Sequence, residues 1–206
     1  SFDGLLTHSG HAYLEKSRGG VAAVAEQERR VMTGFAERLR EEGIAVPGVS
    51  VGSTPAMSVA GSLQGVTEAR PGNYAFHDFM QVTLGSCGVR DCAVTVLATV
   101  VSHRPGGDTS VVDAGALALS KERWAGPDGR ETMGEVFADY EAGVLSPGAR
   151  LVKLSQEHGV VSAPLPVGSR VRILPNHSCL TVAQFDEVHA VRGTEVVDRW
   201  KIWRGR

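Results

Sequence analysis

The chain has 206 residues, of which 42% are hydrophobic and 21% charged, and its formal net charge is -2 at pH 7. This composition predicts a globular protein with a substantial core and excludes low-complexity disorder. Near-neutral charge without a Lys/Arg block argues against nucleic-acid binding, and no apolar run reaches the roughly 18 residues of a membrane span. Three cysteines without paired spacing are typical of a reducing compartment, so we predict a cytoplasmic protein.

The first third of the chain predicts a parallel α/β sheet. Residues 4–7 are typical of a buried strand, residues 49–51 and 66–69 are predicted as a second and a third strand, and apolar residues recur at the helical period over 20–42. Pro55 follows the second run at a position that favours the first turn of a short helix. The alternation of strands and helices predicts parallel pairing through crossover connections.

The remainder of the chain predicts a mostly antiparallel β domain. We therefore expect an α/β domain over residues 1–84 and an all-β domain over residues 85–206. Three β/α units cannot close a parallel barrel, which needs about eight strands, so we expect the chain to be the carboxyl-terminal part of a longer protein. Strands are predicted over 92–103, 110–113, 150–154 and 169–174, with a hairpin of 187–191 and 196–203.

Two motifs follow neighbouring strands of the predicted sheet. Gly52-Ser53-Thr54 lies between a strand and a helix start, where backbone N–H groups and hydroxyls can bind an anion such as phosphate. The turn Arg70-Pro71-Gly72-Asn73-Tyr74 would present Tyr74 at the same sheet edge. The alternatives are an ordinary helix N-cap and a structural turn with a half-buried tyrosine.

The loop after the first strand contains His8, His11 and Tyr13. These side chains could stack on a ring or donate hydrogen bonds to it, or they could be polar loop residues above the sheet. Metal binding by the histidines is a further possibility, although their spacing is unspecific.

His177 and Cys179 are the sharpest candidates for a metal site. In an extended backbone, residues two apart point the same way, so imidazole and thiolate would reach one ion, and this donor set favours zinc. Two protein ligands leave coordination positions open for a substrate. A helix that already includes Cys179 would change this geometry, and the alternative is a buried cysteine beside a surface histidine.

Several segments, taken in order, resemble the carboxyl-terminal half of the D-threonine aldolase and D-serine dehydratase family, which is related to alanine racemase. They are THSGHAY, VGSTPA, GVTEARPGNYAFHDFMQ, CAVTVLATVVSHRPG, VVDAGALALS, LSQEHG and RVRILPNHSCLTVAQFDEVHAVRG. The resemblance implies a fold of class α/β plus all-β: the carboxyl-terminal portion of a (β/α)8 barrel that binds pyridoxal phosphate, followed by an antiparallel β domain with a divalent metal site.

The resemblance also implies roles for particular residues. His177 and Cys179 match the metal motif, with Zn2+ or Mn2+ as the ion, and a cysteine rather than an aspartate at the second position is typical of the zinc-dependent dehydratase branch. The family's Schiff-base lysine lies in a segment that this chain lacks, and the lysines present are not good substitutes: Lys16, Lys121, Lys153 and Lys201. The residues expected to bind the cofactor are Ser53, Thr54, Gly72, Asn73 and Tyr74, to which we add His8.

The resulting prediction is a lyase, dependent on pyridoxal phosphate and a divalent metal, that eliminates water from β-hydroxy-D-amino acids as a D-serine dehydratase does. A D-threonine aldolase, an amino-acid racemase, a non-catalytic pyridoxal-phosphate-binding protein and a zinc hydrolase are the alternatives. The expected partners are a small D-amino acid, the missing amino-terminal half of the barrel and a second copy in a homodimer, with no nucleic acid and no membrane.

Overall fold

The computed structural model describes residues 2–204, which form two compact units. Unit 1 contains the chain up to Ala75 together with Gln81–Cys87, and unit 2 contains Phe76–Met80 together with the chain from Gly88 onward. The domain boundary expected between residues 84 and 85 stays a prediction. None of the helices in the described part of the chain combines the length and the apolar character needed to cross a membrane.

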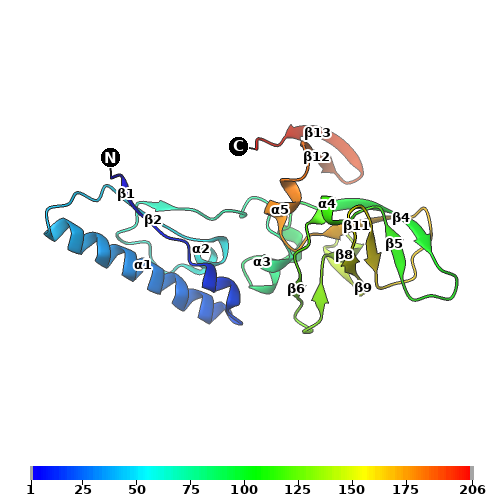
Figure 1. The fold of residues 1–206 in the computed structure, drawn as a ribbon, viewed down its shortest axis with the longest axis horizontal. Coiled ribbons are helices and arrows are strands. Elements are labelled where there is room, and N and C mark those ends of the chain that lie inside the picture. Colours follow the sequence, from blue (N-terminus) through cyan, green and yellow to red (C-terminus); the bar gives the residue numbers. More distant parts are fainter. Residues whose placement is uncertain (1, 205–206) are drawn as a thin grey trace. The chain divides into compact units, whose positions relative to one another are not determined.

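Unit 1 is built on a parallel sheet with strand order β1-β2-β3 (Figure 1). Both strand pairs are parallel, so helices connect the strands as crossovers, as the sequence predicts. The elements in chain order are β1 (Gly4–Leu6), the 3-10 helix η1 (Gly10–Leu14), α1 (Arg18–Glu41), β2 (Gly48–Val51), α2 (Thr54–Val59) and β3 (Glu68–Ala69).

The long helix α1 packs one apolar face against the sheet. Its N-terminus is capped by Ser17, whose hydroxyl accepts a hydrogen bond from the Gly20 N–H. Gly43, with φ +79, follows its C-terminus in the left-handed conformation that glycine adopts without strain. The core between α1 and the sheet consists of Ala36, Val46, Val49 and Val51, with Leu5, Met32, Leu39, Met57 and Val66 packed around them.

Unit 2 is built on a closed barrel of six strands in the order β10-β5-β4-β11-β8-β9 (Figure 1). Every neighbouring pair in it is antiparallel. The barrel strands are β4 (Val96–His103), β5 (Ser110–Val112), β8 (Glu135–Asp139), β9 (Val144–Leu154), β10 (Gly159–Val161) and β11 (Arg170–Leu174). Fully buried branched side chains fill its interior, among them Val100, Val112, Leu151, Val161 and Ile173.

Shorter elements complete the described chain. They are α3 (Phe79–Thr83), the 3-10 helix η2 (Val89–Asp91), α4 (Ala116–Leu119), β6 (Trp124–Ala125), β7 (Glu131–Thr132), α5 (Ser178–Val182), β12 (Glu187–Arg192) and β13 (Glu195–Lys201). The predicted hairpin is confirmed, because β12 and β13 pair as antiparallel strands around Gly193, which has φ +59.

Two expectations about strands need correction. The strand expected from residue 92 begins only at Val96, since Cys92 is the C-cap of η2 and residues 93–95 are not in a strand. The strands β6, β7, β8 and β10 were not predicted. Gly134, with φ +151, leads into β8, and a Cβ atom there would lie 2.9 Å from the Ile173 side chain.

Candidate functional site

The loops that follow the three parallel strands meet within unit 1. The Asn73 N–H donates to Thr54 Oγ1 at 3.0 Å, which joins the loop after β3 to the start of α2. His8 Nδ1 lies 3.2 Å from the Gly52 carbonyl oxygen, which joins the loop after β1 to the loop after β2. The structure therefore brings together residues that the sequence placed at separate strand ends, as expected for one edge of a parallel sheet.

Ser53 and Thr54 are buried, with 1% and 3% of their surface exposed. Ser53 is the N-cap of α2, since its Oγ accepts from the Ala56 N–H at 3.4 Å, and Pro55 occupies the first turn as expected. Each hydroxyl thus accepts one hydrogen bond from a backbone N–H and keeps its own proton to donate. The capping role is observed, and this donor set also fits the phosphate group of pyridoxal phosphate.

Tyr74 and His8 differ from Ser53 in being exposed. Tyr74 is 64% exposed, so its ring is not the half-buried ring of a purely structural turn. Gly72 is also open, because a Cβ atom built there meets no other atom within 4 Å. Tyr74 and Gly72 are therefore accessible to a ligand, on either side of Asn73, whose N–H is bonded to the Thr54 hydroxyl.

Two charged residues that the sequence did not single out hold these strand ends in place. The buried carboxylate of Glu28, on α1, accepts from Ser9 Oγ at 2.9 Å and from the Gly52 N–H at 3.2 Å. Arg70 donates from Nε to Ser50 Oγ at 2.7 Å and from Nη2 to the Thr7 carbonyl. Glu28 could have been found from its position, which is one turn beyond Val24 on the buried face of α1.

His177 and Cys179 lie together at the start of α5 in unit 2. His177 Nδ1 lies 2.6 Å from a carboxylate oxygen of Glu122. The neighbouring Cys179 side chain has the largest effect on the pKa of His177, and the Glu122 carboxylate adds to it; together they raise this pKa to about 9 against the opposing effect of burial. Metal-free His177 is therefore protonated at neutral pH, and a metal ion would displace that proton.

The backbone at this pair differs from the expected one. His177 is extended, with φ -135 and ψ 104, but Cys179 lies in the first turn of α5, so the extended backbone expected through both residues is wrong. The helix begins directly after His177, so Cys179 is one residue inside it.

The donor set fits a divalent metal with open coordination positions. The Glu122 carboxylate is hydrogen-bonded to His177 Nδ1, so Nε2 is the nitrogen available to an ion. The Cys179 side chain is exposed. The part of the chain that the structure describes contains no group of three or more His, Cys, Asp or Glu side chains arranged to hold a metal. Two protein donors leave coordination positions open to other ligands, and a structural zinc site would need four protein ligands.

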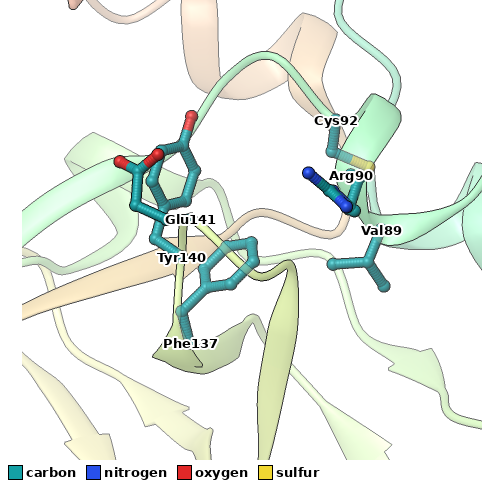
Figure 2. Close-up of a pocket in the computed structure, with 6 residues that line it drawn as sticks. All are labelled: Val89, Arg90, Cys92, Phe137, Tyr140 and Glu141. Carbon is teal, nitrogen blue, oxygen red and sulfur yellow. The ribbon is translucent and has the colours of Figure 1, made fainter. Parts of the chain in front are cut away.

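A separate surface cavity of about 180 Å³ lies in unit 2. Figure 2 shows Phe137, Tyr140 and Glu141 on one side of it, facing Arg90 and its neighbours on the other. The Phe137 and Tyr140 rings meet edge-on, 5.3 Å apart. The residues that line the cavity are Val89, Arg90, Cys92, Phe137, Tyr140 and Glu141, none of which was predicted as a site residue.

Comparison with known proteins gives a consistent result. The family model described as "Putative serine dehydratase domain" matches residues 93–191. D-threo-3-hydroxyaspartate dehydratase from Delftia sp. is 37% identical over 98% of this chain and 56% of its own, and D-serine dehydratase from Dictyostelium discoideum is 35% identical over 97% and 53%. D-threonine aldolase from Arthrobacter sp. is 29% identical over 98% and 51%, so the chain spans about half the length of these curated relatives.

Solved structures agree with these relatives. A metal-free Cys-to-Ala variant of D-threo-3-hydroxyaspartate dehydratase superimposes with a TM-score of 0.89 and 38% identity, covering 99% of this chain and 56% of its own. A His-to-Ala variant of the same dehydratase has also been solved, and the two replaced residues are two positions apart in that protein. The predicted fold class is confirmed. The chain belongs to the family of D-serine dehydratases and D-threonine aldolases, enzymes of the alanine-racemase-like fold.

Proposed function

We propose that the complete protein is a lyase, dependent on pyridoxal phosphate and a divalent metal, that converts β-hydroxy-D-amino acids to a 2-oxo acid and ammonia. The observation that supports this proposal is the placement of His177 as the N-cap of α5 with the exposed Cys179 in its first turn, two side chains whose donor atoms can bind a metal. Their order and spacing equal those of the histidine and cysteine replaced in the related dehydratase.

The strand ends of unit 1 would hold the cofactor. Pyridoxal phosphate, when bound, stabilises negative charge at the substrate's Cα. Ser53 and Thr54 would donate their hydroxyl protons to its phosphate oxygens, while Tyr74 and His8 would contact its ring and Gly72 and Asn73 would line the turn beside it. Since the chain spans about half of its relatives, we propose that the lysine that bonds to the cofactor is supplied by polypeptide outside this sequence.

His177 and Cys179 would hold the metal in unit 2. A divalent ion, when bound there, supplies Lewis acidity that makes a β-hydroxyl a better leaving group. Because the pKa of His177 is raised, its imidazole is protonated at neutral pH and would lose a proton from Nε2 to bind the ion. Nε2 of His177 and the sulfur of Cys179 would be the two donor atoms. A nitrogen and a soft sulfur donor favour Zn2+ over Mn2+.

The second candidate is a retro-aldol reaction, which yields glycine and an aldehyde. The similarity to a D-threonine aldolase favours it, since that relative aligns with nearly the whole of this chain. The same residues would then bind a metal that acidifies the β-hydroxyl, with Cα–Cβ rather than Cβ–O cleavage.

The test uses the complete gene product, purified with pyridoxal phosphate and Zn2+. It is given D-serine, D-threonine and D-threo-3-hydroxyaspartate in turn, and 2-oxo acid is measured against glycine plus aldehyde. We expect 2-oxo acid and ammonia in equal amounts. Glycine and aldehyde as the main products would replace the dehydratase with the aldolase, and turnover of none of the three substrates would refute the proposal.

A further inference from the structure

We propose that Glu122 is a positioning residue that orients the His177 imidazole for metal binding; this inference rests on the proposed function. Glu122 Oε2 lies 2.6 Å from His177 Nδ1. A carboxylate accepts hydrogen bonds, so the Nδ1 proton belongs to this contact and Nε2 is left as the donor to an ion. Second-shell carboxylates of this kind fix both the tautomer and the ring orientation of metal-binding histidines.

The backbone of Glu122, like its side chain, is hydrogen-bonded to the loop that contains His177. Asn176, which precedes His177, donates from Nδ2 to the Glu122 carbonyl at 3.0 Å. The same nitrogen donates to the Thr132 carbonyl at 2.8 Å, and Asn176 is 1% exposed. Two adjacent residues of the loop therefore hold Glu122 at its carbonyl and at its carboxylate, which limits how far the carboxylate can move from the imidazole.

The backbone of the His177 loop is held independently of Glu122. The Ser178 N–H donates to Oδ2 of the fully buried Asp78 at 2.9 Å. The Phe79 N–H donates to the Pro175 carbonyl at 3.1 Å. Because these bonds fix the main chain on both sides of His177, the remaining freedom is rotation of its side chain, and the Glu122 carboxylate restrains that rotation.

The Glu122–His177 contact contributes little to the stability of the fold. Their side chains are 38% and 31% exposed, and ion pairs open to solvent are worth little. Removal of the carboxylate should therefore loosen the imidazole and leave the barrel intact, so an effect on metal binding can be separated from an effect on folding.

The experiment uses the complete protein and compares zinc affinity, by competition with a chromophoric chelator, in the wild type and in Glu122→Ala, Glu122→Gln and Glu195→Gln. Glu195 is the matched control, because it is an exposed glutamate of unit 2 in the hairpin strand β13. We expect Glu122→Ala to weaken zinc binding about 10- to 100-fold. Glu122→Gln keeps an acceptor oxygen, so its zinc affinity should fall by less. The zinc affinity of Glu195→Gln should equal that of the wild type.

Two further readouts report the orientation directly. Bound Co2+ gives a thiolate-to-metal charge-transfer band from Cys179, and in Glu122→Ala this band should persist at saturating metal while the ligand-field bands change. Nitrogen NMR of the zinc-loaded wild type should place the remaining imidazole proton of His177 on Nδ1. A change in fold alone would not produce this pattern.

The outcomes separate this inference from the proposed function. A folded Glu122→Ala protein with zinc affinity within about two-fold of wild type overturns the inference alone. If Glu122→Ala does not fold, the nitrogen NMR spectrum of the zinc-loaded wild type is the deciding measurement. An imidazole proton on Nε2 of His177 in that spectrum overturns the inference. If Cys179→Ala binds zinc as well as the wild type does, the proposed metal site is wrong and the role of Glu122 is wrong with it.

Discussion

The carboxylate of Glu28 offers a direct test of how unit 1 holds its strand ends. It lies on the buried face of α1 and is 7% exposed. It accepts hydrogen bonds from the Ser9 hydroxyl and the Gly52 N–H, at the ends of β1 and β2. Replacement by alanine would remove both acceptors at once.

The magnitude follows from the two donors left behind. A buried donor without a partner costs about 1–3 kcal/mol, so Glu28→Ala should destabilise the strand ends by about 2–6 kcal/mol. Glu28→Gln should cost less, because its amide oxygen can accept from the Gly52 N–H and its NH2 group can donate to Ser9 Oγ.

Amide hydrogen exchange measures this effect locally. The Arg70 N–H, which donates to the Val51 carbonyl at 3.0 Å, reports the adjoining end of the β2–β3 pair without touching Glu28. We expect at least about tenfold faster exchange in Glu28→Ala, the equivalent of 1.4 kcal/mol. Glu37→Ala, an exposed position on the same helix, is the control and should change little. Equal exchange rates in Glu28→Ala and Glu37→Ala would refute the reasoning.

Three further predictions concern unit 2. Cys179→Ala should abolish zinc binding and most turnover of the complete enzyme while the absorbance of bound pyridoxal phosphate stays unchanged; turnover that persists without metal would contradict the role of this residue. Leu151→Ala, in the fully buried barrel core, should lower the free energy of unfolding by about 2–5 kcal/mol in urea titrations, whereas Leu97→Ala, at a 55% exposed position of β4, should change it by less than about 1 kcal/mol. The hydrogen bond from Arg150, followed by those from Arg130, holds the pKa of Asp128 well below its ordinary 3.8, so its stabilising effect is present above pH 3.8 and is lost as the pH falls through the lowered value. Asp128→Asn should therefore shift the urea midpoint downward at pH 7 and by less at pH 3, and an equal shift at both values would show that this pairing does not act through charge.

Local patterns predicted the elements whose stability is local. α1 follows from the helical spacing of its apolar residues, and the β12–β13 hairpin follows from two strand-like runs around Gly193. β1 and β2 were found for the same reason, since each is a short apolar run, whereas β3 is limited to the exposed residues Glu68 and Ala69 of the predicted 66–69. β8 and β10 were missed, and each of them pairs with a strand that is distant in sequence, β11 and β5 respectively.

The candidate sites divide in a similar way. The donors that would contact a cofactor or a metal were identified from their residue types and spacing, and their assignment stays a prediction. The residues that hold those donors were missed, because Glu28, Glu122 and Asp78 reach their partners across 24, 55 and 100 positions of sequence. Of these three residues, only Glu28 could have been identified from the sequence, because it is a charged residue on an apolar helix face.

The amino-acid sequence by itself determined the order of the α/β and β parts, the helical and strand periods, and the presence of one histidine and one cysteine two positions apart. Tertiary structure decided the backbone on which that pair is held, because the segment from Pro175 to Val182 is fixed by partners at Asp78, Phe79 and Glu122. An extended chain and a helix start are both compatible with the local residues there. The physical reason is that buried backbone groups must find hydrogen-bond partners, and here those partners come from distant parts of the chain.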